Sequence, residues 1–242
     1  MAILTALTDA ILNAAYPQVC HSCGKKVQQS IYGVACSECW SDTEMFEEGR
    51  IVCLKCGAVS LAVDPHVSDC PTCRHHEYDL ARSIGAYEKA MSASILHLKK
   101  VPVIPGLLLD SFPTALSAFG PETIDLVVPV PLSKKRQFER GFNQAETIAT
   151  AVSSILGLPV DSASLIRKKH TPMHRAAMDK KARETTVMNA FEVVRPKLIA
   201  GKSVLLVDDI FTSGATVSYC AKALKKKGAA NVKVFTLARA VS

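Results

Sequence analysis

Through the C-terminal two thirds of the chain, short apolar runs alternate with stretches whose apolar residues recur at helical spacing. The runs that fit strands are 81–87, 124–130, 190–194 and 203–207. The stretches that fit helices are 89–100, 145–156 and the segment that starts near Val217. Runs that are apolar on both faces are typical of a parallel sheet covered by helices. We therefore predict an α/β fold over residues 80–242, with a mainly parallel sheet flanked by helices.

The first 79 residues have a different pattern. In residues 1–17 the apolar side chains fall on one face of a predicted amphipathic helix: Ile3, Leu4, Leu7, Ile11 and Leu12. We expect this face to dock on the rest of the protein. Contact with a membrane or a partner is the alternative, although the polar face lacks the Lys and Arg that lipid binding favours. Residues 18–79, which are poor in large apolar side chains, are predicted to form a separate small domain.

Eight of the nine cysteines form four Cys-x-x-Cys pairs, and two such pairs supply the four thiolates of a structural zinc site. We predict a double zinc ribbon with two Zn²⁺ ions and sequential grouping of the pairs. The first group is Cys20, Cys23, Cys36 and Cys39, and the second is Cys53, Cys56, Cys70 and Cys73. The spacing also allows an interleaved grouping. Metal binding, on the order of 10 kcal/mol per ion, would supply much of the folding energy of this segment.

Other residues near these pairs are predicted to have no ligand role. His21, His75 and His76 are neighbours of the cysteines in the sequence, but four sulfurs already complete each site. The ninth cysteine, Cys220, lies on the apolar stripe of a predicted helix and is expected to be a small core residue.

Composition and charge narrow the class of protein. The chain has 242 residues, 48% of them hydrophobic, and a net charge of +7. No run approaches the roughly 18 apolar residues of a membrane span. The N-terminus has no early Lys or Arg and does not fit a signal peptide, so we expect a cytoplasmic protein, with peripheral association at the inner membrane as the alternative. Residues 81–242 hold 24 Lys and Arg against 12 Asp and Glu, which favours a polyanionic ligand.

The strongest chemical signal is the segment 202–216. A strand-like run ends in Asp208 and Asp209, a turn rich in hydroxyl groups and glycine follows, and a helix then begins. The N–H groups and partial positive charge of a helix N-terminus suit a phosphate, and ionised carboxylates accept hydrogen bonds from sugar hydroxyl groups. The pattern predicts a site for a phosphorylated sugar at the carboxyl end of the strand. The alternative is an ordinary strand–turn–helix with Thr212 or Thr216 as N-cap, which leaves the paired acids unexplained.

This segment resembles the ribose-5-phosphate-binding signature of type I phosphoribosyltransferases, with Ser213 where that family usually has threonine. The resemblance implies that Asp208 and Asp209 hold the ribose hydroxyls of phosphoribosyl pyrophosphate, with Mg²⁺ bound to its diphosphate. It also implies that the 5′-phosphate is held by the loop residues Thr212, Ser213, Gly214, Ala215 and Thr216.

A second segment with candidate chemistry follows the strand-like run 124–130. Pro129-Val130-Pro131-Leu132 precedes four cationic side chains within 134–140, a loop suited to hold pyrophosphate. Arg140 is the best candidate and Arg136 the second, because a guanidinium binds phosphate oxygens in bidentate fashion. The alternative is a solvated basic loop.

Pro-Val-Pro-Leu and Arg-Gly-Phe-Asn-Gln, placed upstream of Val-Asp-Asp-x-x-Thr-Ser-Gly-Ala-Thr, are similar to the motifs of the ComF/GntX family. The resemblance covers nearly the whole chain and implies an N-terminal zinc ribbon joined to a phosphoribosyltransferase-like domain. It further implies a role in natural transformation, the uptake of single-stranded DNA, with proteins of the uptake machinery as partners.

A basic stretch lies between Arg167 and Arg183, with seven Lys and Arg, one acid and no glycine. We predict a mobile lid over the bound diphosphate or a surface for DNA phosphates. The candidate residues are Arg167, Lys168, Lys169, Arg175 and Arg183. The stretch is similar to the lid of the family at Arg167, Thr171 and Arg183, and departs from it at Arg175 and Thr186, where Gln and Asn are usual.

Three functions fit these motifs. The first is a phosphoribosyltransferase, with Asp208, Asp209 and Arg140 as its catalytic residues and no acceptor assigned. The second is a non-catalytic factor that binds single-stranded DNA through basic residues and the stacking candidates Phe138 and Phe142. Aromatic residues make up only 6% of the chain, which counts against this alternative. The third is a regulatory protein that senses phosphoribosyl pyrophosphate.

Overall fold

The computed structural model describes residues 17–47, 49, 51–59, 70, 71, 73–168 and 190–241. The predicted helix at 1–17 lies almost entirely outside these ranges. The candidate lid residues Lys169, Arg175 and Arg183 also lie outside the described residues, as do Thr171 and Thr186. Within the described ranges, no helix is long and apolar enough to cross a membrane.

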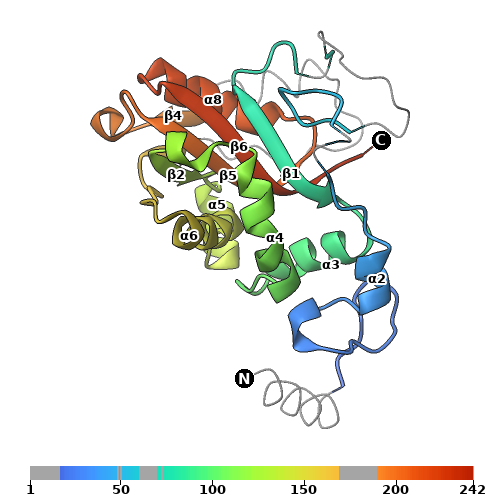
Figure 1. Cartoon of the computed structure of the whole chain (residues 1–242). Helices are drawn as coiled ribbons and strands as arrows, with labels where there is room; N and C mark the ends of the chain where they lie inside the picture. The colour runs from blue at the N-terminus through green and yellow to red at the C-terminus, as the bar shows by residue number, and fades with distance from the viewer. Residues whose placement is uncertain are drawn as a thin grey trace, which may run out of the picture.

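Four parallel strands form the main sheet (Figure 1). In spatial order they are β1 (Leu80–Ala86), β6 (Asn231–Arg239), β5 (Ser203–Phe211) and β2 (Leu126–Pro129). Two short strands, β3 (Leu165–Arg167) and β4 (Phe191–Val193), form a separate antiparallel pair. The predicted α/β fold with a mainly parallel sheet is confirmed.

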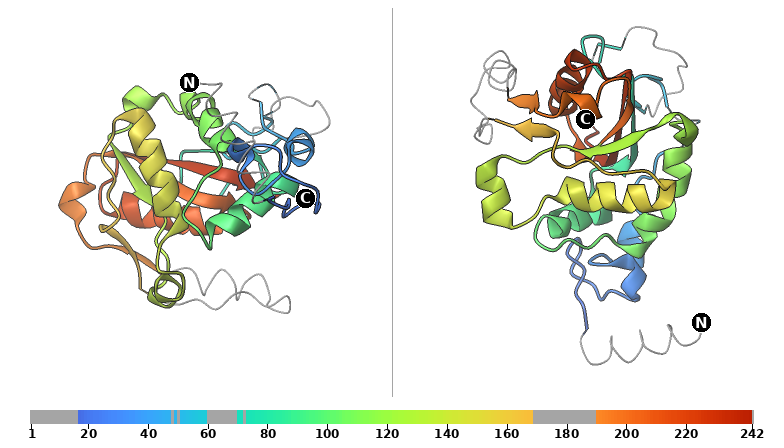
Figure 2. Two further views of the ribbon diagram at one scale, coloured as in Figure 1. Left: turned by 90° about the horizontal axis from the view of Figure 1, so that it is seen from below. Right: turned by 90° about the vertical axis from the view of Figure 1, so that its left-hand side faces the viewer.

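Helices cover both faces of this sheet (Figure 2). One face carries α3 (Lys89–Leu98), α4 (Gly106–Ser117) and α6 (Gln144–Leu156), and the other carries α8 (Ala215–Lys226). The side chains of β5 alternate between the two layers: Leu205 and Val207 join the first, Val204 and Leu206 the second. All four are fully buried, so each contributes roughly 2 kcal/mol through the apolar surface that it removes from water.

Shorter elements complete the described part of the chain. The short α-helices are α2 (Ser37–Ser41) and α5 (Lys134–Arg140). The 3₁₀ turns are η1 (Ser30–Tyr32), η3 (Pro121–Thr123) and η4 (Pro196–Leu198). The stretch 134–140, which the sequence analysis interpreted as a loop, is therefore a helix. Ser133 caps it by accepting a hydrogen bond from the Arg136 backbone N–H at 3.4 Å.

The two cysteine segments pack in separate hydrophobic clusters. The first, with Cys36 and Trp40, belongs to the cluster of α3, α4 and α6. The second, with Cys53 and Tyr78, belongs to the cluster of α8. In Figure 1 the first segment lies beyond α3 and the second lies beside β1. Each segment is thus anchored to a different face of the sheet, and the predicted boundary at residue 79 stays a prediction.

Candidate functional site

The paired acids lie where β5 extends beyond its neighbour β2. The β2–β5 ladder ends with Pro129 opposite Val207, while β5 continues to pair with β6 as far as Phe211. The strand is therefore four residues longer than predicted, and Asp208 and Asp209 lie within it instead of following it. Val130, the residue after β2, still donates to the Val207 carbonyl at 2.8 Å, and β2 does not extend alongside the two acids.

The Asp209 carboxylate is held by side chains from the ends of two helices, α3 and α6. It lies 3.2 Å from Lys99 Nζ, at the end of α3, and accepts a hydrogen bond from Gln144 Nε2 at 3.3 Å, at the start of α6. Gln144 Oε1 in turn accepts from Arg140 Nη1 at 2.8 Å. The residue is 7% exposed. Asp209 and Arg140 are thus linked through Gln144, which belongs to the motif Arg-Gly-Phe-Asn-Gln but was assigned no role, and Lys99 was not among the predicted site residues.

Asp208 points to the other face of the sheet, because successive strand residues alternate. Its Oδ1 accepts a hydrogen bond from the Asp209 backbone N–H at 2.9 Å. Burial and the neighbouring Asp209 carboxylate raise the pKa of Asp208 well above its usual range.

Arg167 is one of the predicted cations, and its charge interacts with that of Asp208. Burial and the charge of Arg136 lower the pKa of Arg167, while Cys220 and Asp208 act in the opposite direction, so these groups are within electrostatic reach of Arg167. The Arg167 guanidinium also lies over the Phe191 ring at 5.3 Å.

The turn between β5 and α8 leaves a helix N-terminus without a side-chain cap. Gly214, with a φ of 76°, is the N-cap, so neither Thr212 nor Thr216 caps the helix as the alternative interpretation required. Thr212 and Ser213 are exposed. Ser213 Oγ accepts a hydrogen bond from the Ala215 N–H at 3.4 Å. The first turn of α8 therefore offers backbone N–H groups and hydroxyl groups to an anion.

The remaining predicted cations are not all at this site. Lys168 is paired with Glu192 at 2.6 Å, across the β3–β4 pair. On α5, Lys134 and Lys135 are exposed, and Phe138 between Arg136 and Arg140 is 92% exposed. Asn143, the asparagine of the Arg-Gly-Phe-Asn-Gln motif, was assigned no role from the sequence; it caps α6 and donates to the Val130 carbonyl at 3.0 Å. It joins the turn after β2 to the helix that carries Gln144.

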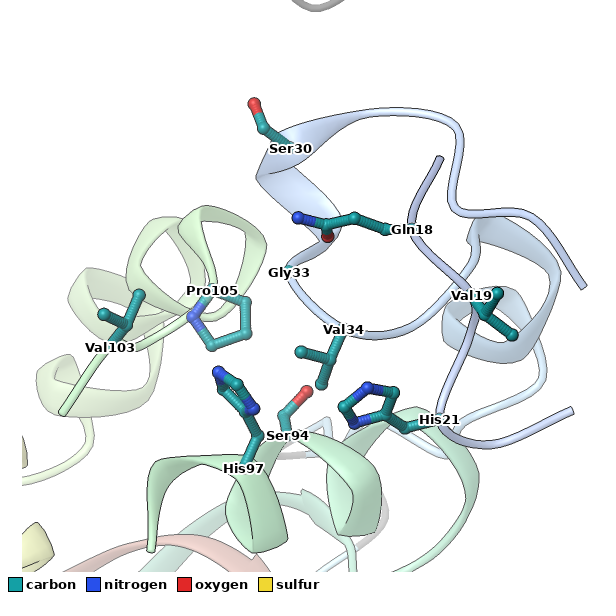
Figure 3. Close-up of a pocket in the computed structure, with 10 residues that line it drawn as sticks. All are labelled: Gln18, Val19, His21, Ser30, Gly33, Val34, Ser94, His97, Val103 and Pro105. Carbon is teal, nitrogen blue, oxygen red and sulfur yellow. The ribbon is translucent and has the colours of Figure 1, made fainter. Parts of the chain in front are cut away.

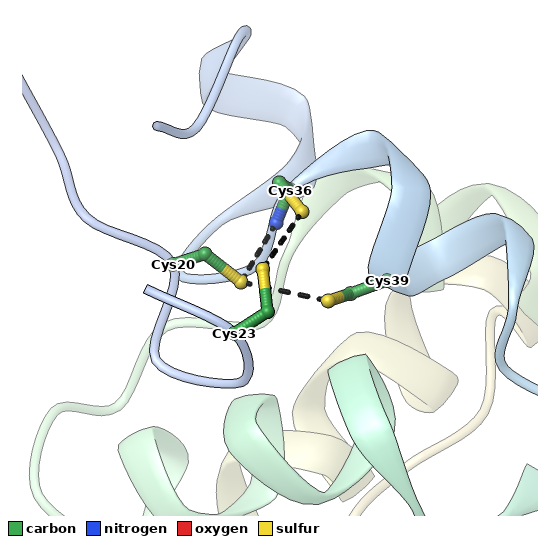
Figure 4. Close-up of side chains that lie close together, drawn as sticks. All are labelled: Cys20, Cys23, Cys36 and Cys39. Carbon is green, nitrogen blue, oxygen red and sulfur yellow. Dashed lines mark hydrogen bonds between the residues drawn. The ribbon is translucent and has the colours of Figure 1, made fainter. Parts of the chain in front are cut away.

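Eight cysteines form the two groups that sequential pairing predicts. In the first, the Sγ atoms of Cys23 and Cys36 are 3.5 Å apart and those of Cys20 and Cys39 are 3.8 Å apart (Figure 4). In the second, Cys53 and Cys73 are 3.6 Å apart, and Cys56 and Cys70 are 3.9 Å apart. Four sulfurs around a tetrahedral zinc at about 2.3 Å would be about 3.8 Å apart.

The donor set therefore fits zinc. All nine cysteines lie in the described part of the chain, and none of them forms a disulfide. A bound cation would favour the thiolate form of the four sulfurs in each group. Cys220 is fully buried in the core, as predicted.

A cavity of about 470 Å³ lies between the first cysteine segment and the helices α3 and α4 (Figure 3). His21, His97 and Pro105 contribute rings to its wall. Ser94 also lines it, and the Ser94 hydroxyl is buried without a hydrogen-bond partner among the described residues. The residues that line the cavity include none of the predicted phosphate or sugar ligands, so it is separate from the β5–α8 turn.

The parallel sheet flanked by helices is a phosphoribosyltransferase-like fold. The family described as the phosphoribosyl transferase domain matches residues 143–242.

Relatives match over most of the chain. The chain is 28% identical to competence protein ComFC of Bacillus subtilis, covering 92% of this chain and 84% of that protein. It is 27% identical to competence protein F of Haemophilus influenzae, covering 95% and 93%. It is 28% identical to DNA utilization protein YhgH of Salmonella typhimurium, covering 92% and 97%. The predicted resemblance to the ComF/GntX family is confirmed.

One solved structure, a glutamine phosphoribosylpyrophosphate amidotransferase from B. subtilis, aligns with 61% of this chain and 26% of that chain. The sequence identity is 20% and the TM-score is 0.35.

Proposed function

We propose that this protein binds phosphoribosyl pyrophosphate together with Mg²⁺ at the β5–α8 turn and acts in DNA uptake. The observation that carries the proposal is the placement of Asp208 and Asp209 directly before an uncapped helix N-terminus. The acids accept hydrogen bonds from the ribose hydroxyls, and the N–H groups at the start of α8 hold the 5′-phosphate. The setting in DNA uptake follows from the names of the relatives, which refer to competence and DNA utilization.

The diphosphate end of the ligand belongs near Arg140, with Arg136 and Arg167 as further cations. Arg140 reaches this region through its hydrogen bond to Gln144. Carboxylates beside a diphosphate suit a hard, oxygen-preferring cation, so Asp208 and Asp209 fit Mg²⁺, which supplies charge neutralisation of the diphosphate oxygens when bound.

The proposed reaction is transfer of the phosphoribosyl group. The bond from C1 of the sugar to the pyrophosphate oxygen breaks, its electron pair leaves with pyrophosphate, and a bond from the acceptor to C1 forms. Asp208 and Asp209 orient the ribose, and the guanidinium groups stabilise the charge on the leaving group. We assign no acceptor.

Calorimetry with phosphoribosyl pyrophosphate and Mg²⁺ tests the proposal. The wild-type protein should bind, and Asp208→Asn/Asp209→Asn should weaken binding at least tenfold, because the ribose loses its charged acceptors. Asp110→Asn, at an exposed position of α4, is the matched control. Equal affinity in the double variant and the wild type would refute the site. Release of pyrophosphate in a metabolite mixture would distinguish a transferase from a protein that only senses the ligand.

A second candidate function, binding of single-stranded DNA, is favoured by one observation. Phe138 is 92% exposed on α5, beside the exposed side chains of Lys134 and Lys135. An exposed aromatic ring among cations can stack on a base while the cations contact phosphates, which is worth about 1–3 kcal/mol per base.

Fluorescence anisotropy with a labelled oligonucleotide tests this candidate. Phe138→Ala should weaken binding roughly five- to 100-fold, as expected from the loss of one stacked base. Leu54→Ala, which removes another exposed apolar side chain, is the control. Lys134→Ala/Lys135→Ala should reduce the dependence of affinity on salt concentration. If Phe138→Ala and Leu54→Ala bind alike, α5 is not a DNA-binding surface.

A further inference from the structure

The segment that leaves the second cysteine group runs along the helix of the phosphate loop. The Glu77 N–H donates to Ser218 Oγ at 3.0 Å, and the Glu77 carboxylate lies 3.4 Å from Lys222 Nζ. Two residues further on, Asp79 pairs with Lys225 at 2.6 Å. Ser218, Lys222 and Lys225 are spaced at i, i+4 and i+7, so these contacts follow one face of α8.

His76 lies at the start of this segment. Its backbone forms hydrogen bonds to residues in or beside both Cys-x-x-Cys pairs of the second cysteine group. Its N–H donates to the Cys73 carbonyl at 3.0 Å. Its carbonyl accepts from Lys55 Nζ at 2.7 Å, and Lys55 lies between Cys53 and Cys56. The position of His76 therefore depends on the relative placement of the two Cys-x-x-Cys pairs.

The His76 ring lies against the N-cap of α8. Its Nδ1 is 2.9 Å from the hydroxyl of Tyr78, which sets the orientation of the ring. A Cβ atom on Gly214 would be 2.8 Å from His76 Cε1 and 2.6 Å from Phe211 Cζ. Two rings, one from β5 and one from the cysteine segment, therefore occupy the space that a side chain at Gly214 would need.

Phe211 is tied to the same cysteine group. Tyr78 packs edge-on against it, with ring centroids 6.0 Å apart, and the Arg239 guanidinium lies 4.5 Å from its ring centroid. Arg239 donates to the Cys56 carbonyl at 2.7 Å, and its second nitrogen lies 3.6 Å from the Cys56 sulfur. Both rings next to Gly214 are therefore held by contacts that begin at the second cysteine group.

We propose that His76 is a positioning residue for the β5–α8 turn, through which the second cysteine group sets the conformation of the phosphate-binding backbone. The expected effect of His76 on ligand binding rests on the proposed function, because it requires that the turn binds a phosphoryl group. The positioning itself does not depend on any ligand. This role goes beyond the sequence-based interpretation of His76 as a residue with no part in the site.

Hydrogen exchange of the ligand-free protein tests the positioning. His76→Ala should raise amide exchange in residues 212–217 at least tenfold, while residues 144–156 of α6 exchange as in the wild type. His75→Ala is the matched control, since His75 is the exposed neighbour on the same turn, and it should leave exchange unchanged. His76→Phe, which restores a ring against Gly214, should return exchange close to the wild-type rate. Metal content measured in parallel shows whether each variant retains its cysteine groups.

Binding of ribose 5-phosphate gives the second readout. His76→Ala should weaken binding at least fivefold, and His75→Ala should bind as the wild type does. Unchanged exchange in 212–217 for His76→Ala would overturn the positioning, whatever the affinities. A wild type that binds no ribose 5-phosphate would instead overturn the proposed function, and the exchange result would still decide the role of His76. If His76→Ala does not fold, Ser218→Ala removes the anchor of Glu77, and the same local rise in exchange is expected.

Discussion

Asp208 and Asp209 are neighbours in the chain with different surroundings, because adjacent residues of a strand face opposite sides of the sheet. Asp209 has a cation, Lys99, and an amide, Gln144, within contact distance. Asp208 is held by the Asp209 backbone, and its pKa is raised by burial and by the Asp209 charge. The two acids therefore have different electrostatic surroundings, and the pKa of Asp208 is the one that is raised.

We expect Asp208 to make the protein less stable as the pH rises. Its raised pKa means that the folded state binds this proton more tightly than the unfolded state does. The stabilisation is fully present below the unfolded pKa of about 3.9 and is lost as the pH rises through the folded pKa. Asp208→Asn, which carries no charge, should therefore melt at a higher temperature than the wild type at pH 8, with a smaller difference at pH 5.

Thermal melting across this pH range is the measurement, with Asp110→Asn on the exposed side of α4 as the control. Melting curves of Asp208→Asn that stay parallel to those of the wild type would contradict the raised pKa.

At the level of single residues, the grouping of the cysteines was predicted correctly from a local pattern, while the ligand roles of the two acids and of Arg140 stay predictions. The contacts of Lys99 and Gln144 with Asp209 could not be predicted, because they form only after segments far apart in the sequence have folded together. His76 was interpreted as a bystander for the same reason. Its contact with Gly214 joins residues that no sequence spacing relates.

At the scale of elements, the turn from β5 to α8 requires a glycine at position 214 for two reasons, its backbone conformation and the lack of space for a side chain. Gly214 precedes the first residue of α8 and Gly141 follows the last residue of α5. Their φ angles are nearly the same, 76° and 77°. A Cβ on Gly141 would meet nothing within 4 Å, whereas one on Gly214 would meet Phe211 and His76. Alanine substitutions at the two positions therefore separate the effect of backbone strain from the effect of steric overlap with neighbouring side chains.

We expect Gly141→Ala to lower the free energy of unfolding by about 1–2 kcal/mol, which is the cost of the left-handed conformation. Gly214→Ala should lower it by about 3 kcal/mol or more, because overpacking adds to that strain. Urea unfolding of both variants is the measurement. A similar decrease in the free energy of unfolding in the two variants would mean that the rings next to Gly214 move aside at little energetic cost.

Strand and helix prediction succeeded where the apolar pattern was regular and failed where polar atoms find distant partners. The strand β6 was not predicted, because Lys233 and Thr236 interrupt its apolar run. Lys233 Nζ bonds Thr123 Oγ1 at 2.6 Å, and Thr236 Oγ1 is 2.7 Å from Ser83 Oγ. Prolines likewise concealed α4, which contains Pro113 and is held by the buried Leu108, Phe112 and Leu116.

Over the whole molecule, the two cysteine groups stabilise different parts of one fold, because each packs in its own hydrophobic cluster. The sequence predicted the grouping of the ligands correctly. It gave no information on which face of the sheet each group would contact, since that depends on the completed sheet.

We expect Cys36→Ser and Cys56→Ser each to lose one zinc ion and to retain the other, with a lower melting temperature in both cases. Only Cys56→Ser should also raise hydrogen exchange in residues 212–217. Elemental analysis of the purified variants measures the zinc content. Loss of both ions from either variant would show that the two groups form one cooperative unit.

The pairing of β1 has a consequence for the order of synthesis. In the main sheet β1 borders β6 alone, and β6 follows it by about 150 residues. While a ribosome is still translating the codons between them, β1 can bond the earlier residues Glu44 and Phe46, but its strand partner β6 does not yet exist. The edge of β1 that will pair with Asn231–Arg239 is therefore open to aggregation until that strand leaves the exit tunnel.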